Sequence, residues 1–149
     1  MGETIARNRR AHHDYSIEET FEAGLVLRGT EIKSVRDHKV SLADAYARIE
    51  HGEAWIIGLH IAPWGTTDVR FNHEPKRARK LLLHRREIDE LLGKTKAKGL
   101  TIVPLSIYLS RGRAKMELGL ARGKQMFDKR QKLQDKQQKR DLDRINKHR

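Results

Sequence analysis

Eight histidines are the residues of this 149-residue chain that could most readily bind a metal ion or transfer protons. His12 and His13 are adjacent, and neighbouring side chains of an extended segment point in opposite directions, so the pair does not suit one metal ion. No His-Glu-x-x-His pair, EF-hand loop, phosphate-binding glycine loop or Gly-x-Ser-x-Gly turn occurs. The absence of cysteine excludes thiol catalysis and cysteine-ligated zinc. The sequence therefore predicts no metal, no cofactor and no catalytic residue. His84, before Arg85-Arg86, better suits a helix cap or a phosphate contact.

Positive charge is the dominant chemical feature of the chain. The formal net charge is +12 and the pI is near 10.2. Residues 111–149 hold 14 Lys/Arg and 5 Asp/Glu, a net of +9, whereas residues 1–110 hold 18 and 15, a net of +3. A basic arm on a nearly balanced body is typical of a protein that binds a polyanion, above all nucleic acid.

The segment from Gly123 to Arg149 is read as a tail. Its apolar residues, among them Phe127, Leu142 and Ile145, are too scattered for the broad stripe of a packed helix. Nearly all its residues are nevertheless tolerated or favoured in helices. We therefore predict a body of residues 1–122 and a basic tail of residues 123–149, disordered when free and helical when bound.

Membrane insertion and secretion are not expected. No apolar run approaches the roughly 20 residues of a membrane span, and the first residues lack the hydrophobic core of a signal peptide. The sequence thus predicts a soluble cytoplasmic protein.

Hydrophobic periodicity places the elements that would position these residues. Alternation predicts strands over 15–27, 43–50, 54–61, 101–109 and 114–121. Gly24 is expected to mark a bulge or bend, Pro104 an edge or bulge, and His51-Gly52-Glu53 a three-residue hairpin connection. Helical spacing predicts one helix over 29–36, with Thr30 as N-cap, and another over 85–98, ending at Gly99.

This inventory predicts a mainly β fold, namely a small OB-type closed β-barrel with two or three short helices. A β-sandwich is the competing fold. Phe21, Tyr46 and Tyr108 are expected to pack inward, which leaves no row of exposed aromatic rings for single-stranded nucleic acid. Folded RNA is the better candidate. Trp64, in a loop, suits either a lid on the barrel or base stacking.

Six sequence blocks, in consistent order, carry a family likeness. They are Asn8-Arg9-x-Ala11, Phe21-Glu22-Ala23-Gly24, Gly29-Thr30-Glu31-Ile32-Lys33-Ser34, Arg79-Lys80-Leu81-Leu82-Leu83-His84, Val103-Pro104-Leu105 and Gly123-Lys124-x-x-x-Asp128-Lys129-Arg130. Together they resemble the SsrA-binding protein (small protein B) family of bacterial trans-translation, and the likeness covers nearly the whole chain.

The resemblance implies an RNA-binding adaptor that catalyses nothing. Members of this family bind the tRNA-like domain of transfer-messenger RNA and deliver it to stalled ribosomes. The tail would enter the empty mRNA channel near the small-subunit decoding site and become helical there. An elongation factor carrying the aminoacylated RNA is a further possible partner.

The resemblance also implies the site residues. Asn8, Glu22, Leu82 and Lys115 match the family's RNA-binding face, and the same blocks add Arg9, Lys33, His84 and Lys124. Lys115 suits phosphate, Asn8 suits sugar or base edges, and Leu82 suits an exposed base. Glu22, as a carboxylate, would accept bonds from base amino groups or 2′-hydroxyls, orient an Arg, or simply be a solvated strand residue.

In the tail, the resemblance implies a decoding-site segment and a distal helical segment. The predicted residues are Phe127, Asp128, Lys129, Arg130, Lys132, Lys136, Arg140, Leu142, Arg144 and Ile145. Phe127 stands where relatives often carry His or Tyr, so the resemblance implies stacking without a hydrogen bond.

Two other functions compete with the adaptor. A structural ribosomal protein with a basic extension has the same composition, and a small RNA-cleaving enzyme would need a convergent His, Lys or carboxylate set.

Overall fold

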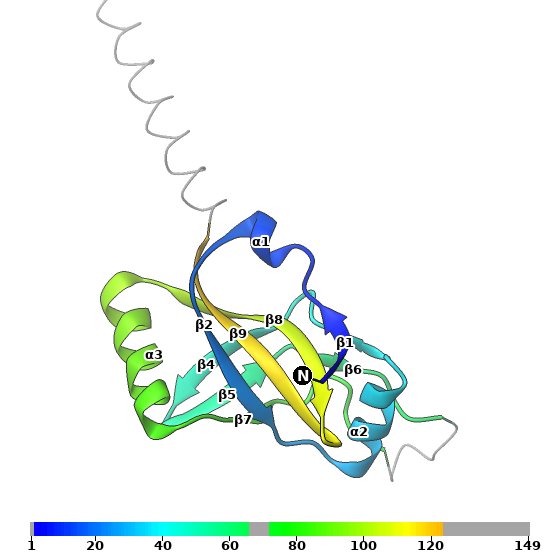
Figure 1. The fold of residues 1–149 in the computed structure, drawn as a ribbon. Coiled ribbons are helices and arrows are strands. Elements are labelled where there is room, and N and C mark those ends of the chain that lie inside the picture. Colours follow the sequence, from blue (N-terminus) through cyan, green and yellow to red (C-terminus); the bar gives the residue numbers. More distant parts are fainter. Residues whose placement is uncertain (1, 66–71, 124–149) are drawn as a thin grey trace, which may run out of the picture.

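The computed structural model describes residues 2–65 and 72–123 (Figure 1). Its elements are β1 (Glu3–Arg7), α1 (Ala11–Asp14), β2 (Tyr15–Leu25), α2 (Gly29–Arg36), β3 (Val40–Ser41), β4 (Tyr46–Glu50), β5 (Glu53–Ile57), β6 (His60–Ile61), β7 (Arg79–Leu82), α3 (Arg85–Lys98), β8 (Thr101–Ser110) and β9 (Arg113–Gly123). The prediction of a mainly β protein with short helices is confirmed. None of the helices within the described ranges is long and apolar enough to cross a membrane.

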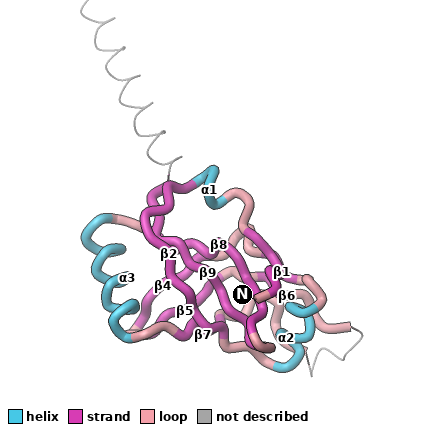
Figure 2. Tube along the Cα trace, in the orientation of Figure 1, coloured by secondary structure: helices cyan, strands magenta, loops and turns pink. Residues whose placement is uncertain are grey.

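The main sheet closes on itself. Its strands pair in the order β1-β8-β4-β5-β7-β2-β9, and β9 pairs again with β8, so six strands form one continuous ring. The strand β1 lies outside this ring, paired with the second half of β8, while β4 pairs with the first half. Strands β3 and β6 form a separate small pair. Figure 2 shows the strands gathered at the centre, with α3 at one side and α2 near the opposite end.

Alternating side chains fill the ring. Met116, Leu118 and Leu120 of β9 are fully buried, as their spacing predicts, and Phe21 of β2 packs with them. Burial of each such side chain contributes about 1.5–3 kcal/mol. A second, smaller cluster of Ala11, Val103, Leu105 and Ala121 lies where α1 meets β8 and β9. This second cluster fixes the N-terminal segment against the outside of the ring.

Two hairpins turn through two residues each. His51 and Gly52 have φ values of 51° and 76°, and Arg111 and Gly112 have 53° and 75°. Such left-handed pairs match the twist of antiparallel strands. The hairpin prediction is confirmed, but the three-residue connection is wrong, because Glu53 already pairs with Glu50.

Irregular pairing occurs in β2 and β8. The sequence predicts a bulge or bend at Gly24, but the register shift of β2 lies between Ile17 and Glu19. Gly24 pairs regularly, and its lack of a side chain admits the neighbouring strand, since a Cβ there would lie 3.3 Å from the Leu82 Cβ. In β8 the register shifts between Pro104 and Ser106, which confirms the bulge predicted for Pro104.

Both predicted helices are confirmed with their predicted bounds, and Gly99 ends α3 in the left-handed conformation. The prediction that Thr30 is the N-cap of α2 is wrong. Arg28 holds that position, and its N–H donates to Glu31 Oε1 at 2.8 Å. The Thr30 hydroxyl lies 2.9 Å from His73 Nδ1 instead, and His73 Nε2 donates to the Ile61 carbonyl at 2.8 Å. The short elements β1 and α1 were not predicted, because β1 pairs with a strand remote in sequence and α1 spans only four residues.

A buried ion pair ties α2 to β7. Arg79 and Glu31 have side chains with no exposed surface, and Arg79 Nε donates to Glu31 Oε2 at 2.5 Å. Arg77 donates to the other carboxylate oxygen. Further Arg79 N–H groups reach the carbonyls of Leu59 and Pro75. Burial disfavours the charged form of Glu31, but the hydrogen bonds from Arg77, the Arg28 N–H and Arg79 outweigh it and lower the Glu31 pKa.

Candidate nucleic-acid interface

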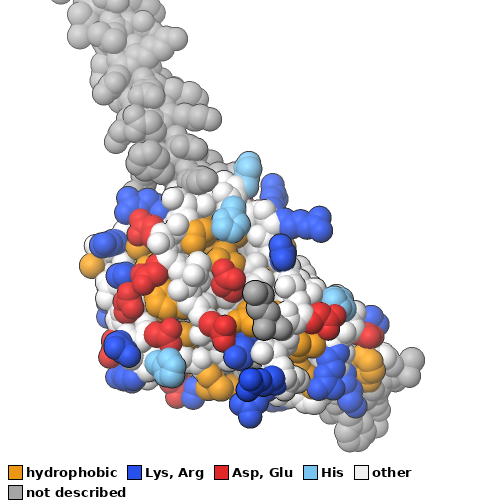
Figure 3. Space-filling model, viewed as in Figure 1, with side chains coloured by type: hydrophobic (Ala, Val, Ile, Leu, Met, Phe, Trp, Pro, Cys, Tyr) orange, Lys and Arg blue, Asp and Glu red, His pale blue; other side chains and the backbone are white. Residues whose placement is uncertain are grey.

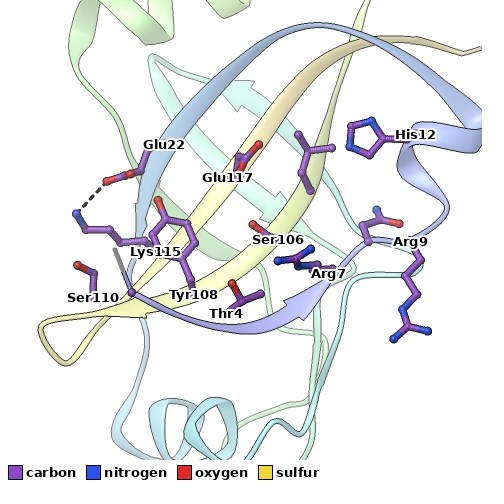
Figure 4. A pocket seen from close by; sticks show the side chains of 13 residues that line it. Thr4, Arg7, Arg9, His12, Glu22, Ser106, Tyr108, Ser110, Lys115 and Glu117 are labelled. Carbon is purple, nitrogen blue, oxygen red and sulfur yellow. Dashed lines mark hydrogen bonds and ion pairs between the residues drawn. The ribbon is translucent and has the colours of Figure 1, made fainter.

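A polar groove of about 760 Å³ crosses the outer face of β1, β8, β9 and β2 (Figure 4). It brings together Asn8, Arg9, Glu22 and Lys115, four residues for which the family resemblance implies RNA binding. They come from segments at both ends of the described chain, and antiparallel pairing of β2, β9 and β8 makes them neighbours. All its lining residues except Leu105 are at least partly exposed, so the groove suits a large ligand rather than a small enclosed one.

Strand register explains why these side chains share a face. Directly paired residues in a sheet project to the same side. Lys115 pairs with Gly24 of β2 and with Tyr108 of β8, and Glu22 pairs with Glu117. The buried Met116 between the two β9 residues points inward, so Lys115 and Glu117 both point outward.

Glu22 is held in place by two neighbours. Lys115 Nζ donates to Glu22 Oε1 at 2.9 Å, across the strand pair. Hydrogen bonds from the Tyr108 hydroxyl and from Lys115 lower the pKa of Glu22. Burial and the bond to Glu22 in turn raise the pKa of Tyr108. The Lys115 ammonium is therefore shared with a carboxylate, and any anion in the groove would have to compete with Glu22 for it.

Asn8 is anchored at the β8 bulge. Its Nδ2 donates to the Pro104 carbonyl at 2.9 Å, and its backbone N–H donates to the Leu105 carbonyl at 2.8 Å. The irregular backbone at Pro104 thus positions one end of the groove. The next residue, Arg9, is exposed and lines the same end.

Leu82 lies beside the groove rather than in it. Its side chain is 55% exposed, the largest exposure among the large apolar residues of the described chain. It pairs with Gly24, which pairs on its other side with Lys115, so Leu82 and Lys115 flank the same glycine. An exposed leucine at this place offers an apolar surface on which a base can pack.

The structure does not bring every predicted residue together. Lys33 lies exposed on α2 and His84 lies at the N-cap of α3, and neither lines the groove. His84 is the cap residue by position, as predicted, and its N–H donates to Glu87 Oε1 at 3.1 Å. The tail predictions lie outside the described residues: Lys124, Phe127, Asp128, Lys129, Arg130, Lys132, Lys136, Arg140, Leu142, Arg144 and Ile145.

Two aromatic predictions are wrong. Tyr46 is 42% exposed on β4, and Tyr108 lies half-buried on the outer face instead of in the core. The bulge at Pro104 shifts the alternation of β8, which is why Tyr108 turns outward while Ile107 is fully buried. Trp64 is half-buried and lies outside the groove. That it either covers the barrel or stacks on a base stays a prediction.

Sequence reasoning named four of the thirteen residues that line the groove, and Arg7, Tyr108 and Glu117 are among those it missed. Glu117 could have been found from Lys115, since residues two apart in a strand share a face. Arg7 gave no such signal, because β1 was not predicted. No group of three metal-ligating side chains occurs in residues 2–65 and 72–123.

A closed ring of strands with an open, charged groove on its outer face defines a class of small β protein that presents a surface to a large ligand. Comparison with known proteins gives the family. The family model described as "SmpB protein" matches residues 5–148, and the chain belongs to this family.

Similar proteins support this assignment along the whole length. The chain is 56% identical over 141 residues to the SsrA-binding protein of Bacillus cytotoxicus, covering 95% of this chain and 90% of the relative. It is 53% identical over 152 residues to that of Thermosynechococcus vestitus, covering all of both chains. A chain from the solved structure described as "tmRNA-SmpB: a journey to the center of the bacterial ribosome" is 54% identical, with a TM-score of 0.67 over 80% of this chain and 83% of that one.

Proposed function

We propose that this protein is an RNA-binding adaptor of ribosome rescue. It binds the tRNA-like domain of transfer-messenger RNA and delivers this RNA to stalled ribosomes. The observation that carries the proposal is the groove in which Asn8, Arg9, Glu22 and Lys115 meet, in a chain whose relatives are named for binding SsrA. The protein acts in the cytoplasm as a binding partner and catalyses no step itself.

The body and the tail divide this work. The ring of strands is an OB-type closed β-barrel, which uses its outer face to hold RNA. Lys115 and Arg9 contact phosphates, Asn8 contacts sugar or base edges, and Leu82 packs on an exposed base. Lys33 and His84 make contacts away from the groove. The basic tail of residues 123–149 acts separately from this body, although its first residue, Gly123, still pairs with Tyr15 as the last residue of β9.

The tail occupies the empty mRNA channel near the decoding site and becomes helical there. Lys124, Phe127 and the Asp128-Lys129-Arg130 block lie near the decoding site, with the ring of Phe127 stacking on a base. Farther along, Lys132, Lys136, Arg140 and Arg144 contact phosphates, while Leu142 and Ile145 anchor one face of the helix. An elongation factor with the aminoacylated RNA is a further partner.

Deleting residues 129–149 tests the division of roles. The shortened chain should bind a transcript of the tRNA-like domain with nearly unchanged affinity, measured by fluorescence anisotropy. It should fail to support peptide tagging in a reconstituted translation reaction on an mRNA without a stop codon. Equal loss of both activities would contradict the division. Presence on every ribosome in a one-to-one ratio would instead indicate a structural ribosomal protein.

A further inference from the structure

Glu117 is a second carboxylate at the centre of the groove. It is half-buried on β9 and pairs directly with Glu22 of β2, so both side chains project from the same face. Figure 4 shows Glu117 extending into the groove between β8 and β2. Like charges in directly opposed positions destabilise a sheet. The arrangement therefore calls for an explanation other than stability.

The two carboxylates differ in their partners. Glu22 accepts hydrogen bonds from Lys115 and Tyr108. Glu117 makes no hydrogen bond or ion pair with any other residue in the described ranges, and its charge acts on Tyr108 only from a distance. Its two oxygens are free to accept bonds from a ligand.

Charge is sorted within this face. Figure 3 shows acidic side chains over the middle of the face and Lys and Arg mostly around its edges. Arg7 and Arg9 line one end of the groove and Lys115 the other, with Glu117 between them. RNA phosphates would meet the cations at the ends, whereas a carboxylate at the centre repels phosphate and accepts only from N–H or O–H groups.

Among RNA groups, the base edge that best fits a free carboxylate is that of guanine. Its N1–H and N2–H₂ are adjacent donors that can meet the two carboxylate oxygens together. Such an edge is accessible only in an unpaired nucleotide, which is the kind of RNA element that proteins read by base.

We infer that Glu117 reads the Watson–Crick edge of an unpaired guanine in the bound RNA, while Glu22 beside it helps to exclude phosphate from the centre of the groove. This inference rests on the proposed function, because it assigns a specificity-determining residue to the same RNA-binding site.

The test combines a variant with a base analogue. Transcripts of the tRNA-like domain carry inosine at random guanine positions, and inosine lacks the N2 amino group. Full-length protein, either wild type or Glu117→Gln, selects the transcripts it binds, and inosine positions are mapped in bound and free pools. The matched control is Glu53→Gln, which removes the same charge from β5 beside Lys80, outside the groove. Circular dichroism of each variant checks the fold.

The expected result is one unpaired position at which inosine weakens binding of the wild type and of Glu53→Gln about tenfold but leaves Glu117→Gln unaffected. Glu117→Gln should also bind an unrelated RNA hairpin about twofold more tightly, because a repulsive charge has gone. Identical inosine profiles for wild type and Glu117→Gln would overturn the inference, even if both bind the tRNA-like domain well. If Glu117→Gln does not fold, the same profile is taken with Glu117→Ala. A wild type that binds this domain no better than the hairpin would instead overturn the proposed function.

Discussion

Replacement of Arg79 by methionine should strongly destabilise the fold. The Arg79 side chain has no exposed surface, and it donates to Glu31 and to the carbonyls of Leu59 and Pro75. Methionine fills much of the space but leaves the buried carboxylate and the two carbonyls short of donors. Breaking a buried ion pair from one side costs about 3–5 kcal/mol. Because Arg77 and the Arg28 N–H still reach Glu31, we expect the low end, about 3 kcal/mol.

Urea denaturation followed by far-ultraviolet circular dichroism measures this change. With a slope of about 1.5 kcal/mol per molar urea, the midpoint should fall by about 2 M. Lys80→Met is the matched control on the neighbouring residue, whose ion pair with Glu53 is 3.4 Å long and partly exposed. That control should change the free energy of unfolding by less than about 0.5 kcal/mol.

The double variant Glu31→Leu/Arg79→Met separates charge from packing. It removes both ions, so much of the loss should be recovered, because no carboxylate then remains buried without its partner. A double variant as unstable as Arg79→Met would refute the electrostatic reasoning. So would an Arg79→Met midpoint within about 0.3 M of the wild type.

Three further outcomes are expected. The pKa of Glu31 is lowered in the folded state, so the stability that its carboxylate contributes is present above the unfolded-state pKa near 4.3 and is lost as the pH falls through the folded-state pKa. In Glu31→Gln, the midpoint of urea denaturation should therefore fall less steeply than in the wild type as the pH is lowered through this range. Leu82→Ala should weaken binding of the tRNA-like domain about tenfold, while the free energy of unfolding changes by less than about 0.5 kcal/mol. The control Val26→Ala removes another exposed side chain and should change neither quantity. A large loss of stability in Leu82→Ala would place Leu82 in the core. Tyr108→Phe should raise the Glu22 pKa in a carboxyl NMR titration, and an unchanged titration would exclude the hydrogen bond.

Sequence patterns predicted the elements whose signals are local. The apolar alternation of β9 and the spacing of Ile88 and Leu91 in α3 follow from which residues must avoid water, so neither depends on a distant partner. Gly99 marked the end of α3 because a left-handed residue costs little when it lacks a side chain. The family resemblance predicted four residues that meet in the groove, although spacing alone could not show that they would meet.

Tertiary structure decided whatever depends on register between remote strands. Pro104 predicted an edge or a bulge, but only the pairing of β8 with β9 decided that the bulge turns Tyr108 outward and leaves a carbonyl for Asn8. Pairing of β2 with β9 set Glu22 opposite Glu117, because a strand shows which residues share its own face but not which residues of another strand lie beside them. The chain by itself thus determined its longer strands, its two longer helices and its charge, whereas the closure of the ring determined which charges meet.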